Sequence, residues 1–214
     1  MGVVKKRVVI GATGASGSIY LLRTLRALLV EGPDVDLVIS KYGAVTLKQE
    51  TPFGDFRGPF PDFLGTLYPE TLDCGTLTVH NHANQGASIA SGSVSVDAMI
   101  VVPCTMKTLG GIANGLSRNL IERAADVALK ERRPVVVVLR EAPYNLIHIR
   151  NMALLTEAGG CVLPASPAFY QHPQNFEDLG DYIAASALRL CGIPNALGKA
   201  WEGIGNETAG REDS

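Results

Sequence analysis

The sequence lacks long apolar runs, paired cysteines and any strong excess of charge. No stretch of its 214 residues reaches the roughly 18 apolar residues that a membrane-spanning helix needs. The four cysteines stand far apart and form no C-x-x-C pair, which predicts reduced thiols and neither a disulfide framework nor a zinc site. A net charge of −2 gives no reason to expect nucleic acid or an anionic membrane as a partner. A strand-like run already begins at Arg7, so we expect no signal peptide and a cytoplasmic protein.

Small and apolar residues are abundant. With 46% hydrophobic residues, 19% charged residues and 23 glycines, the composition is typical of one globular domain with tight loops. Near-continuous runs rich in Val and Ile predict strands covered on both faces, at residues 7–12, 36–40, 98–103, 134–140 and 161–164. Helical patterns separate or follow them, at residues 18–31, 42–50, 108–114, 117–132, 146–158 and 177–190. This alternation predicts a single α/β domain with a doubly wound parallel sheet over residues 1–202.

Two segments fall outside this alternation. Residues 51–72 are punctuated by Pro, Gly and Phe, which predicts an irregular excursion that serves as a surface loop or an oligomer contact. The last dozen residues, 203–214, are predicted to form a flexible tail.

A turn of small residues follows the first predicted strand, with the pattern G-x-x-G-x-x-G over residues 11–17. This spacing differs from the dinucleotide fingerprint, and the second strand ends in Ser40-Lys41 without the acidic residue that an NAD ribose requires. No Gly-Lys-Ser/Thr follows, which also excludes a nucleoside triphosphate P-loop. What remains is a strand-to-helix turn whose N–H groups hold either a phosphate monoester or the edge of a flavin. Ser16 in this turn is either a helix cap or a working hydroxyl.

Two further loops of small polar residues accompany this turn. Residues 90–93 read Ala-Ser-Gly-Ser, and residues 103–108 read Pro-Cys-Thr-Met-Lys-Thr between a strand and a helix. Loops at the carboxyl ends of parallel strands line the ligand crevice of such a sheet. Together the loops predict a mononucleotide held by backbone N–H groups and hydroxyls.

A basic cluster is predicted beside the same crevice. In the helix for which Ser117 is the predicted cap, Arg123 and Lys130 stand two turns apart and point the same way. Arg140 and Glu141 end the fourth predicted strand. These charges either converge on a phosphorylated substrate or form ion pairs on a solvated face with the acidic residues interspersed among them.

The histidines and the single tryptophan carry weaker signals. His80 and His82 lack nearby acidic or cysteine partners in the sequence, which disfavours a metal site. His148 falls in an apolar helical pattern that is typical of a core histidine. Trp201 is expected to pin the C-terminus.

Several motifs together resemble the UbiX-type flavin prenyltransferases. They are TGASGS, ASGS, PCTMKTLGGIANGL, NLIERAADVALKERRPVVVVLREAP and PASPAFYQHP, in the family's order over nearly the whole chain. The resemblance implies a flavodoxin-like, Rossmann-like fold and a homo-oligomer, usually a dodecamer, with sites shared between subunits. It implies transfer of a dimethylallyl group from dimethylallyl monophosphate or diphosphate to N5 and C6 of reduced FMN, without a metal. The prenylated FMN then serves a UbiD-type decarboxylase.

The resemblance also implies roles for individual residues. Ser16 matches a proton-relay serine near flavin N5 with Glu50 as its acidic partner, and Lys130 and Glu141 complete the implied catalytic set. The implied cofactor-binding residues are Gly14, Ala15, Ser16, Ser40, Thr105, Met106, Lys107, Thr108 and Arg140. The implied residues around the prenyl phosphate are Gly92, Arg123, Lys130, Arg140, Glu141, Tyr170, Ser186 and Trp201.

Two positions depart from the family pattern. Ser186 stands where the family usually has a phosphate-binding arginine, with Arg189 one turn further on, and Asn84-Gln85 replace a usual Asp and an aromatic residue. A non-catalytic carrier of FMN or prenylated FMN therefore stays open, as does direct decarboxylation of a hydroxyaryl acid. A flavin-dependent cysteine decarboxylase of the same fold is disfavoured, because residues 40–79 contain no histidine for its catalytic role.

Overall fold

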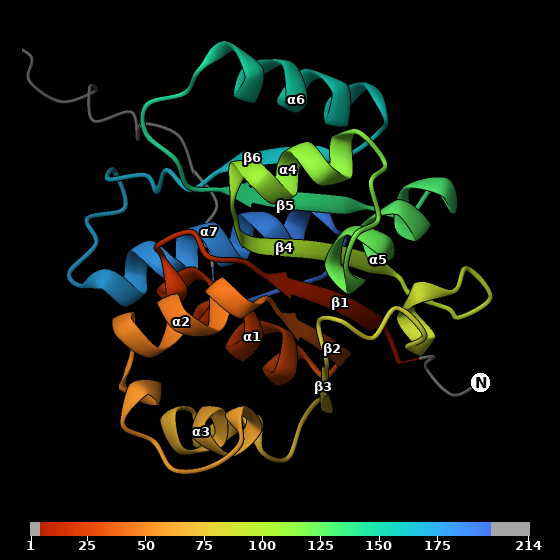
Figure 1. Cartoon of the computed structure of the whole chain (residues 1–214). Coiled ribbons are helices and arrows are strands. Elements are labelled where there is room, and N and C mark those ends of the chain that lie inside the picture. Colours follow the sequence, from red (N-terminus) through yellow and green to blue (C-terminus); the bar gives the residue numbers. More distant parts are fainter. Residues whose placement is uncertain (1–4, 198–214) are drawn as a thin grey trace, which may run out of the picture.

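Six parallel strands form one sheet at the centre of the molecule, in the order β3-β2-β1-β4-β5-β6 (Figure 1). The computed structural model describes residues 5–197. The strands are β1 (Arg7–Ala12), β2 (Asp34–Ile39), β3 (Leu77–His80), β4 (Ala98–Cys104), β5 (Val135–Leu139) and β6 (Cys161–Pro164). The Val- and Ile-rich segments of β1, β4 and β5 are buried because helices cover both faces of the sheet, as their near-continuous apolar runs predict.

The helices form two layers, one on each face of the sheet. They are α1 (Ser18–Glu31), α2 (Lys41–Glu50), α3 (Phe60–Leu67), α4 (Met106–Ala113), α5 (Leu120–Lys130), α6 (Leu146–Glu157) and α7 (Phe176–Leu190). Short 3-10 helices are η1 (Pro52–Gly54), η2 (Pro69–Thr71) and η3 (Ser88–Ala90). One hydrophobic core joins the sheet to α1, α3 and α7, and the other joins it to α4, α5 and α6. Over residues 5–197, none of the helices combines the length and apolar character needed to cross a membrane.

The direction of winding changes between β1 and β4. From β1 the chain first adds β2 and β3 on one side, and it then crosses back to add β4, β5 and β6 on the other. The carboxyl ends of the strands at such a switch point are the usual ligand position of a doubly wound sheet. We call this side of the sheet the carboxyl edge and the opposite side the amino edge. The structure confirms the predicted single α/β domain with a doubly wound parallel sheet.

Most predicted boundaries lie within two residues of the observed ones, and β1, β6 and α1 begin and end as predicted. The helix predicted at residues 117–132 is shorter. Asn119 caps α5 by accepting a hydrogen bond from the N–H of Glu122 at 3.1 Å, so the prediction that Ser117 is the cap is wrong. Ser117 has a φ of 41°, which places its backbone outside the helix.

Residues 51–72 are more regular than the sequence predicts. They contain η1, α3 and η2, and their phenylalanine rings form a cluster with centroids 5.1 to 6.0 Å apart that packs onto the core. The rings belong to Phe53, Phe56, Phe60 and Phe63. Pro59 and Pro61 stand at the start of α3, where proline is tolerated, so they begin a helix and do not break one.

The edge strand β3 is also missed by the sequence analysis, because it is only four residues long and only two of them, Leu77 and Val79, are apolar. Beside it, the carboxylate of Asp36 is nearly fully buried, at 3% exposure. It accepts hydrogen bonds from Arg7 at 2.6 and 3.0 Å and lies 2.6 Å from Nε2 of His80. Burial raises the pKa of Asp36, but hydrogen bonds from Arg7 and His80 outweigh it, and the pKa lies below its ordinary value. His80 is therefore a partner of Asp36, and the part of the chain described here contains no group of three metal-ligating side chains.

We expect Asp36→Asn to lower the free energy of unfolding by about 3 kcal/mol at neutral pH, because the Arg7 guanidinium loses its carboxylate. An unfolded Asp has a pKa of about 3.9, and the folded value of Asp36 is lower. The stabilisation is therefore complete above the unfolded pKa and is lost as the pH falls through the folded pKa. Urea unfolding from neutral pH into the acid range should show the difference between the two proteins shrinking.

Asp34→Asn is the matched control, because Asp34 pairs with Lys5 at the surface, where both side chains are more than 40% exposed. Its expected loss is below about 1 kcal/mol. An equal loss in both variants, or a loss in Asp36→Asn that does not change with pH, would contradict the assignment.

Candidate active site

The turn that follows β1 is pressed against α2. A Cβ added at Gly14 would lie 2.7 Å from Cβ of Tyr42, so only glycine fits at this position. Gly17 has a φ of 115°, a left-handed conformation that favours glycine, and it is the N-cap of α1. Packing and backbone conformation thus explain these two glycines of the motif. Ser16 lies between them and is exposed.

Glu50, the last residue of α2, closes this turn. Its Oε2 accepts hydrogen bonds from the backbone N–H of Gly17 at 2.9 Å and from that of Ser18 at 2.8 Å. The hydroxyl of Ser16 lies near the same carboxylate and helps to lower its pKa. The structure therefore brings Ser16 and Glu50 together. The interpretation of Ser16 as the helix cap is wrong, because Gly17 is the cap residue.

This contact limits what the turn can bind. The free N–H groups at a helix N-terminus attract anions, and here the Glu50 carboxylate already takes those of Gly17 and Ser18. A phosphate monoester would have to displace or approach this negative charge. Of the two ligands that the sequence leaves open for the turn, the structure favours the edge of a flavin.

The carboxyl group of Glu50 is held in its ionised form. Partial burial raises its pKa, but hydrogen bonds from the Ser16 hydroxyl and from the N–H groups of Ser18 and Gly17 outweigh burial, and the pKa is lowered. A carboxylate that contacts a hydroxyl group is a base positioned to receive its proton.

Loops after β2, β4 and β5 lie at the same carboxyl edge. Ser40 caps α2 by accepting from the N–H of Gly43 at 3.0 Å. Thr105 caps α4 by accepting from the N–H of Thr108 at 3.2 Å. Nε of Arg140 donates to the carbonyl of Ser16 at 3.0 Å. The edge therefore carries the whole predicted cofactor-binding set, namely Gly14, Ala15, Ser16, Ser40, Thr105, Met106, Lys107, Thr108 and Arg140.

Glu141 and Tyr170 also lie at the carboxyl edge. Glu141 follows β5 and is exposed, and its Oε1 accepts a hydrogen bond from the N–H of Ala142 at 3.1 Å. Tyr170 lies in the connection between β6 and α7 and is half exposed. An acid and an aromatic ring thus stand on the same side of the sheet as Ser16.

Other predicted site residues lie toward the amino edge. Lys130 ends α5 shortly before β5 begins at Val135. Gly92 lies next to it, since a Cβ added there would lie 2.7 Å from Nζ of Lys130. Arg133 donates to the carbonyl of Gly92 at 3.0 Å. The prediction that residues 90–93 belong to the carboxyl-edge loops is therefore wrong, because this segment leads into the amino end of β4 and packs on α5.

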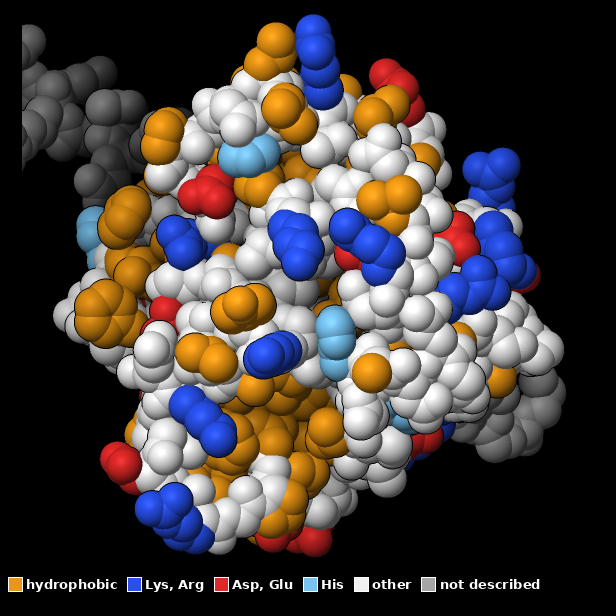
Figure 2. Space-filling model, in the orientation of Figure 1, with side chains coloured by type: hydrophobic (Ala, Val, Ile, Leu, Met, Phe, Trp, Pro, Cys, Tyr) orange, Lys and Arg blue, Asp and Glu red, His pale blue; other side chains and the backbone are white. Residues whose placement is uncertain are grey.

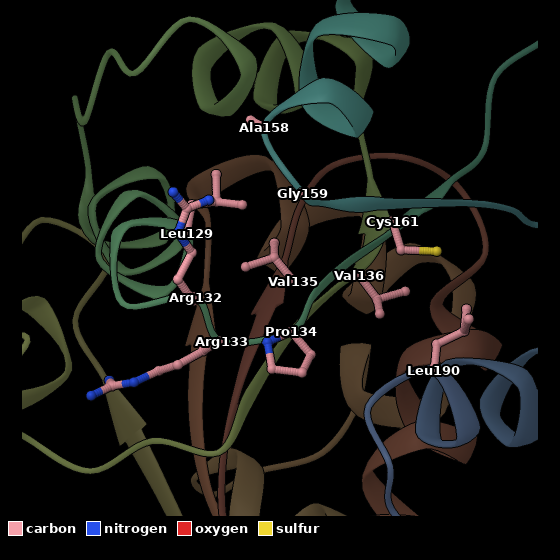
Figure 3. Close-up of a pocket in the computed structure, with 10 residues that line it drawn as sticks. All are labelled: Leu129, Arg132, Arg133, Pro134, Val135, Val136, Ala158, Gly159, Cys161 and Leu190. Carbon is pink, nitrogen blue, oxygen red and sulfur yellow. The ribbon is translucent and has the colours of Figure 1, made fainter.

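Ser186 also lies toward the amino edge. It is buried on α7 and accepts a hydrogen bond from Nη2 of Arg189 at 3.2 Å. One turn later, Leu190 lines a hollow of about 330 Å³ together with the first residues of β5 and β6 (Figure 3). None of the predicted site residues within 5–197 lines this hollow.

The basic residues of α5 form ion pairs within the chain. Arg123 pairs with Asp126 at 2.9 Å and donates to the carbonyl of Ala90 at 3.2 Å. Lys130 pairs with Glu131. Within one chain the ion-pair interpretation of these charges is therefore correct. Because the pairs are partly exposed, each contributes little to stability, and exchange for a phosphate ligand costs little.

Two of the weaker candidates are now resolved. His148 is not a core histidine, since it stands in the first turn of α6 and forms a reciprocal capping box with Asn145. The carbonyl of His82 accepts from the N–H of Leu120, and burial lowers the pKa of its ring. Trp201 and residues 203–214 lie outside the described residues.

Comparisons with known proteins agree with this arrangement. The Flavoprotein family model matches residues 3–187. Flavin prenyltransferase UbiX of Pseudomonas aeruginosa is 42% identical over 199 residues, which cover 92% of this chain and 94% of that protein. The crystal structure of AnUbiX (PadA1) in complex with FMN and dimethylallyl pyrophosphate matches with a TM-score of 0.82 and 38% identity, covering 94% of this chain and 99% of that one.

A dodecameric FMN-dependent UbiX-like decarboxylase from Escherichia coli O157:H7 matches with a TM-score of 0.79 and 37% identity, covering 92% of this chain and 100% of that one. Near-full coverage at this identity extends over both the carboxyl-edge loops and α5. The chain therefore belongs to the UbiX-type flavin prenyltransferases of the Flavoprotein family.

Proposed function

We propose that this protein transfers a dimethylallyl group from dimethylallyl monophosphate or diphosphate to N5 and C6 of reduced FMN, for use by a UbiD-type decarboxylase. The observation that carries the assignment of roles is the Glu50 carboxylate, which is held at the switch point by the N–H groups of Gly17 and Ser18, beside Ser16. Glu50 and Ser16 both lie at the carboxyl edge of the sheet. The chain as a whole is 42% identical to flavin prenyltransferase UbiX of Pseudomonas aeruginosa.

The carboxyl edge has the donor chemistry that FMN requires. The turn at Gly14 and Ala15 would let a flat ring approach the backbone, and hydroxyl groups from Ser40 and the Thr105–Thr108 turn would hold the rest of the cofactor. Arg140 adds a cation beside the Ser16 carbonyl. When bound, reduced FMN supplies the nucleophilic positions that accept the allyl group. In this proposal Glu50 receives and returns the proton of Ser16 Oγ.

The remaining residues fit the departure of a phosphate. Breaking an allylic C–O bond leaves negative charge on the phosphate, which needs cationic donors and an acid. Arg123 and Lys130 supply the cations and Glu141 the acid. Tyr170, together with Trp201, supplies an aromatic wall for the allyl cation. Gly92 and Ser186 are the further residues proposed to lie around the prenyl phosphate.

We infer that a second copy of the chain completes each site. The flavin set lies at the carboxyl edge, whereas Gly92, Lys130 and Ser186 lie toward the amino edge of the same chain. In this proposal assembly of copies brings the two sets together, and it is supported by the relative from E. coli O157:H7, which is dodecameric. Exposed apolar side chains gather over α6, at the top of Figure 2, which fits a surface covered by another copy. They are Leu146, Ile147, Ile149 and Leu154.

A second candidate function is a non-catalytic carrier of FMN or prenylated FMN. The observation that favours it is Ser186, whose hydroxyl accepts from Arg189 and offers no charge to a phosphate. The cysteine decarboxylase alternative has no such support, because Glu50 stands in the segment in which those enzymes have their histidine.

Incubation of the protein with reduced FMN and dimethylallyl monophosphate, without oxygen, is expected to yield a flavin that carries one dimethylallyl adduct. Mass spectrometry of the released cofactor measures it, and the diphosphate is tested in parallel. Recovery of unmodified FMN with both donors would overturn the enzyme assignment and favour the carrier.

Ser16→Ala and Glu50→Gln are each expected to lower kcat by about 100-fold or more, because the proton relay at Oγ is lost. The control is Glu31→Gln at the far end of α1, which should keep the wild-type rate. FMN titration of each variant separates binding from chemistry. Wild-type turnover by either site variant would refute the relay.

Mixed oligomers test whether sites are shared. Glu50→Gln and Lys130→Ala, each inactive alone, are dissociated, mixed and reassembled. Random assortment should restore about a quarter of the wild-type rate. About half of the sites receive an intact carboxyl-edge set, from a Lys130→Ala copy, and about half of those also receive an intact amino-edge set, from a Glu50→Gln copy. A mixture of Ser16→Ala with Glu50→Gln, which damages the same half twice, should stay inactive. No recovery in the first mixture would refute the shared site.

A further inference from the structure

Thr13 connects the loops that follow β1 and β4, the two strands on either side of the switch point. It follows β1 directly and is nearly fully buried, at 3% exposure. Its hydroxyl donates to the carbonyl of Pro103 at 2.8 Å and accepts from the N–H of Thr105 at 2.8 Å. Its backbone N–H donates to the same Pro103 carbonyl at 3.1 Å. Three hydrogen bonds of one residue therefore connect the turn after β1 to the end of β4 and to the turn that follows it.

A hydroxyl is needed here because the strand ladder ends just before this point. The paired register of β1 and β4 runs as far as Gly11 and Val101. Pro103 has no N–H with which to continue it. The Thr13 hydroxyl is both donor and acceptor, and it accepts a hydrogen bond from the amide of Thr105. A valine of the same shape would leave this buried amide and one carbonyl interaction unmatched.

Both loops that Thr13 joins belong to the proposed FMN site. On one side, Thr13 precedes Gly14 and Ser16 in the turn that Glu50 closes. On the other side, the Thr105 amide that it holds begins the turn in which Thr105 caps α4 and contacts the Thr108 hydroxyl at 3.1 Å. The position of the flavin-edge turn relative to the α4 turn therefore depends on one buried hydroxyl.

We propose that Thr13 is a positioning residue that sets the spacing of the two FMN-binding loops through its hydroxyl. The proposal rests on the proposed function for the identity of the ligand. Thr13 itself does not touch the reacting atoms, since it lies beneath the turn, and it acts through the Thr105 amide and the Pro103 carbonyl.

The test is FMN affinity, measured by flavin fluorescence titration of the full-length apoprotein. Thr13→Val should weaken FMN binding by about tenfold or more, because both hydrogen bonds of the hydroxyl, to the Pro103 carbonyl and from the Thr105 amide, are lost. Thr13→Ser, which keeps the hydroxyl, should bind within about threefold of the wild type. Thr13→Cys, with a weak donor and acceptor, should lie between them. The visible circular dichroism of bound FMN should change in Thr13→Val and stay unchanged in Thr13→Ser.

Thr71→Val is the matched control. Thr71 is equally buried, and its hydroxyl donates to the carbonyl of Tyr68 at 2.8 Å, remote from both loops. It should lower Tm as Thr13→Val does and leave FMN affinity unchanged. If Thr13→Val does not fold, the FMN affinities of the other two variants decide. Thr13→Ser is expected to bind FMN more tightly than Thr13→Cys.

The outcomes separate the two proposals. Wild-type FMN affinity and circular dichroism in Thr13→Val would overturn the role of Thr13 alone. So would equal losses of affinity in the Thr13 and Thr71 variants, or a failure of Thr13→Ser to restore binding. A wild-type protein that does not bind FMN would instead overturn the proposed function.

Discussion

The flavin edge depends on one charge–dipole contact, between the carboxylate of Glu50 and the first amides of α1. It joins the last residue of α2 to the first turn of α1, which are 32 and 33 residues apart in sequence. The carboxylate complements the positive end of the α1 dipole, and this keeps it ionised beside Ser16. The same negative charge repels phosphate from the turn after β1, although the glycines of this turn would otherwise let a phosphate approach the backbone. The turn after β1 therefore favours the edge of a flavin over a phosphate. The exposed hydroxyl of Ser16 in this turn lies beside the carboxylate of Glu50.

The sequence predicts the central strands and α1 because each is a long signal of a single type, either a Val-rich run or an amphipathic repeat with a glycine stop. It predicts Ser16 and Glu50 as a pair only through resemblance to a family, since their contact is tertiary. The strand β3 and the helix α3 escape prediction because the first has only four residues, half of them polar, and the second begins among prolines. Tyr42 and Thr13 escape for another reason. Their partners, Gly14 and Pro103, are chosen by the packing of separate elements, which no local pattern encodes.

The placement of the basic residues follows from helix geometry. Seven residues of α5 separate Arg123 from Lys130, which is about 10 Å along the axis, so one end of the row lies well away from the flavin turn. Sequence spacing correctly places both on one helix, but it says nothing of which edge of the sheet each approaches. In one chain they are neutralised by Asp126 and Glu131. Partly exposed pairs of this kind contribute little to stability.

The order of the strands also governs when the site can exist during synthesis of the chain. The neighbours β1 and β4 pair residues that are 90 positions apart, as in Val8 with Ala98, and Arg140 reaches the Ser16 carbonyl across 124 positions. A nascent chain that has just passed Glu50 already contains both Ser16 and Glu50, but it has neither the β4 loop nor the β5 loop beside them. Contacts of such long range form late, because loop closure must precede them. The Ser16 hydroxyl is thus encoded early and enclosed last, and an incomplete chain cannot offer a finished flavin site.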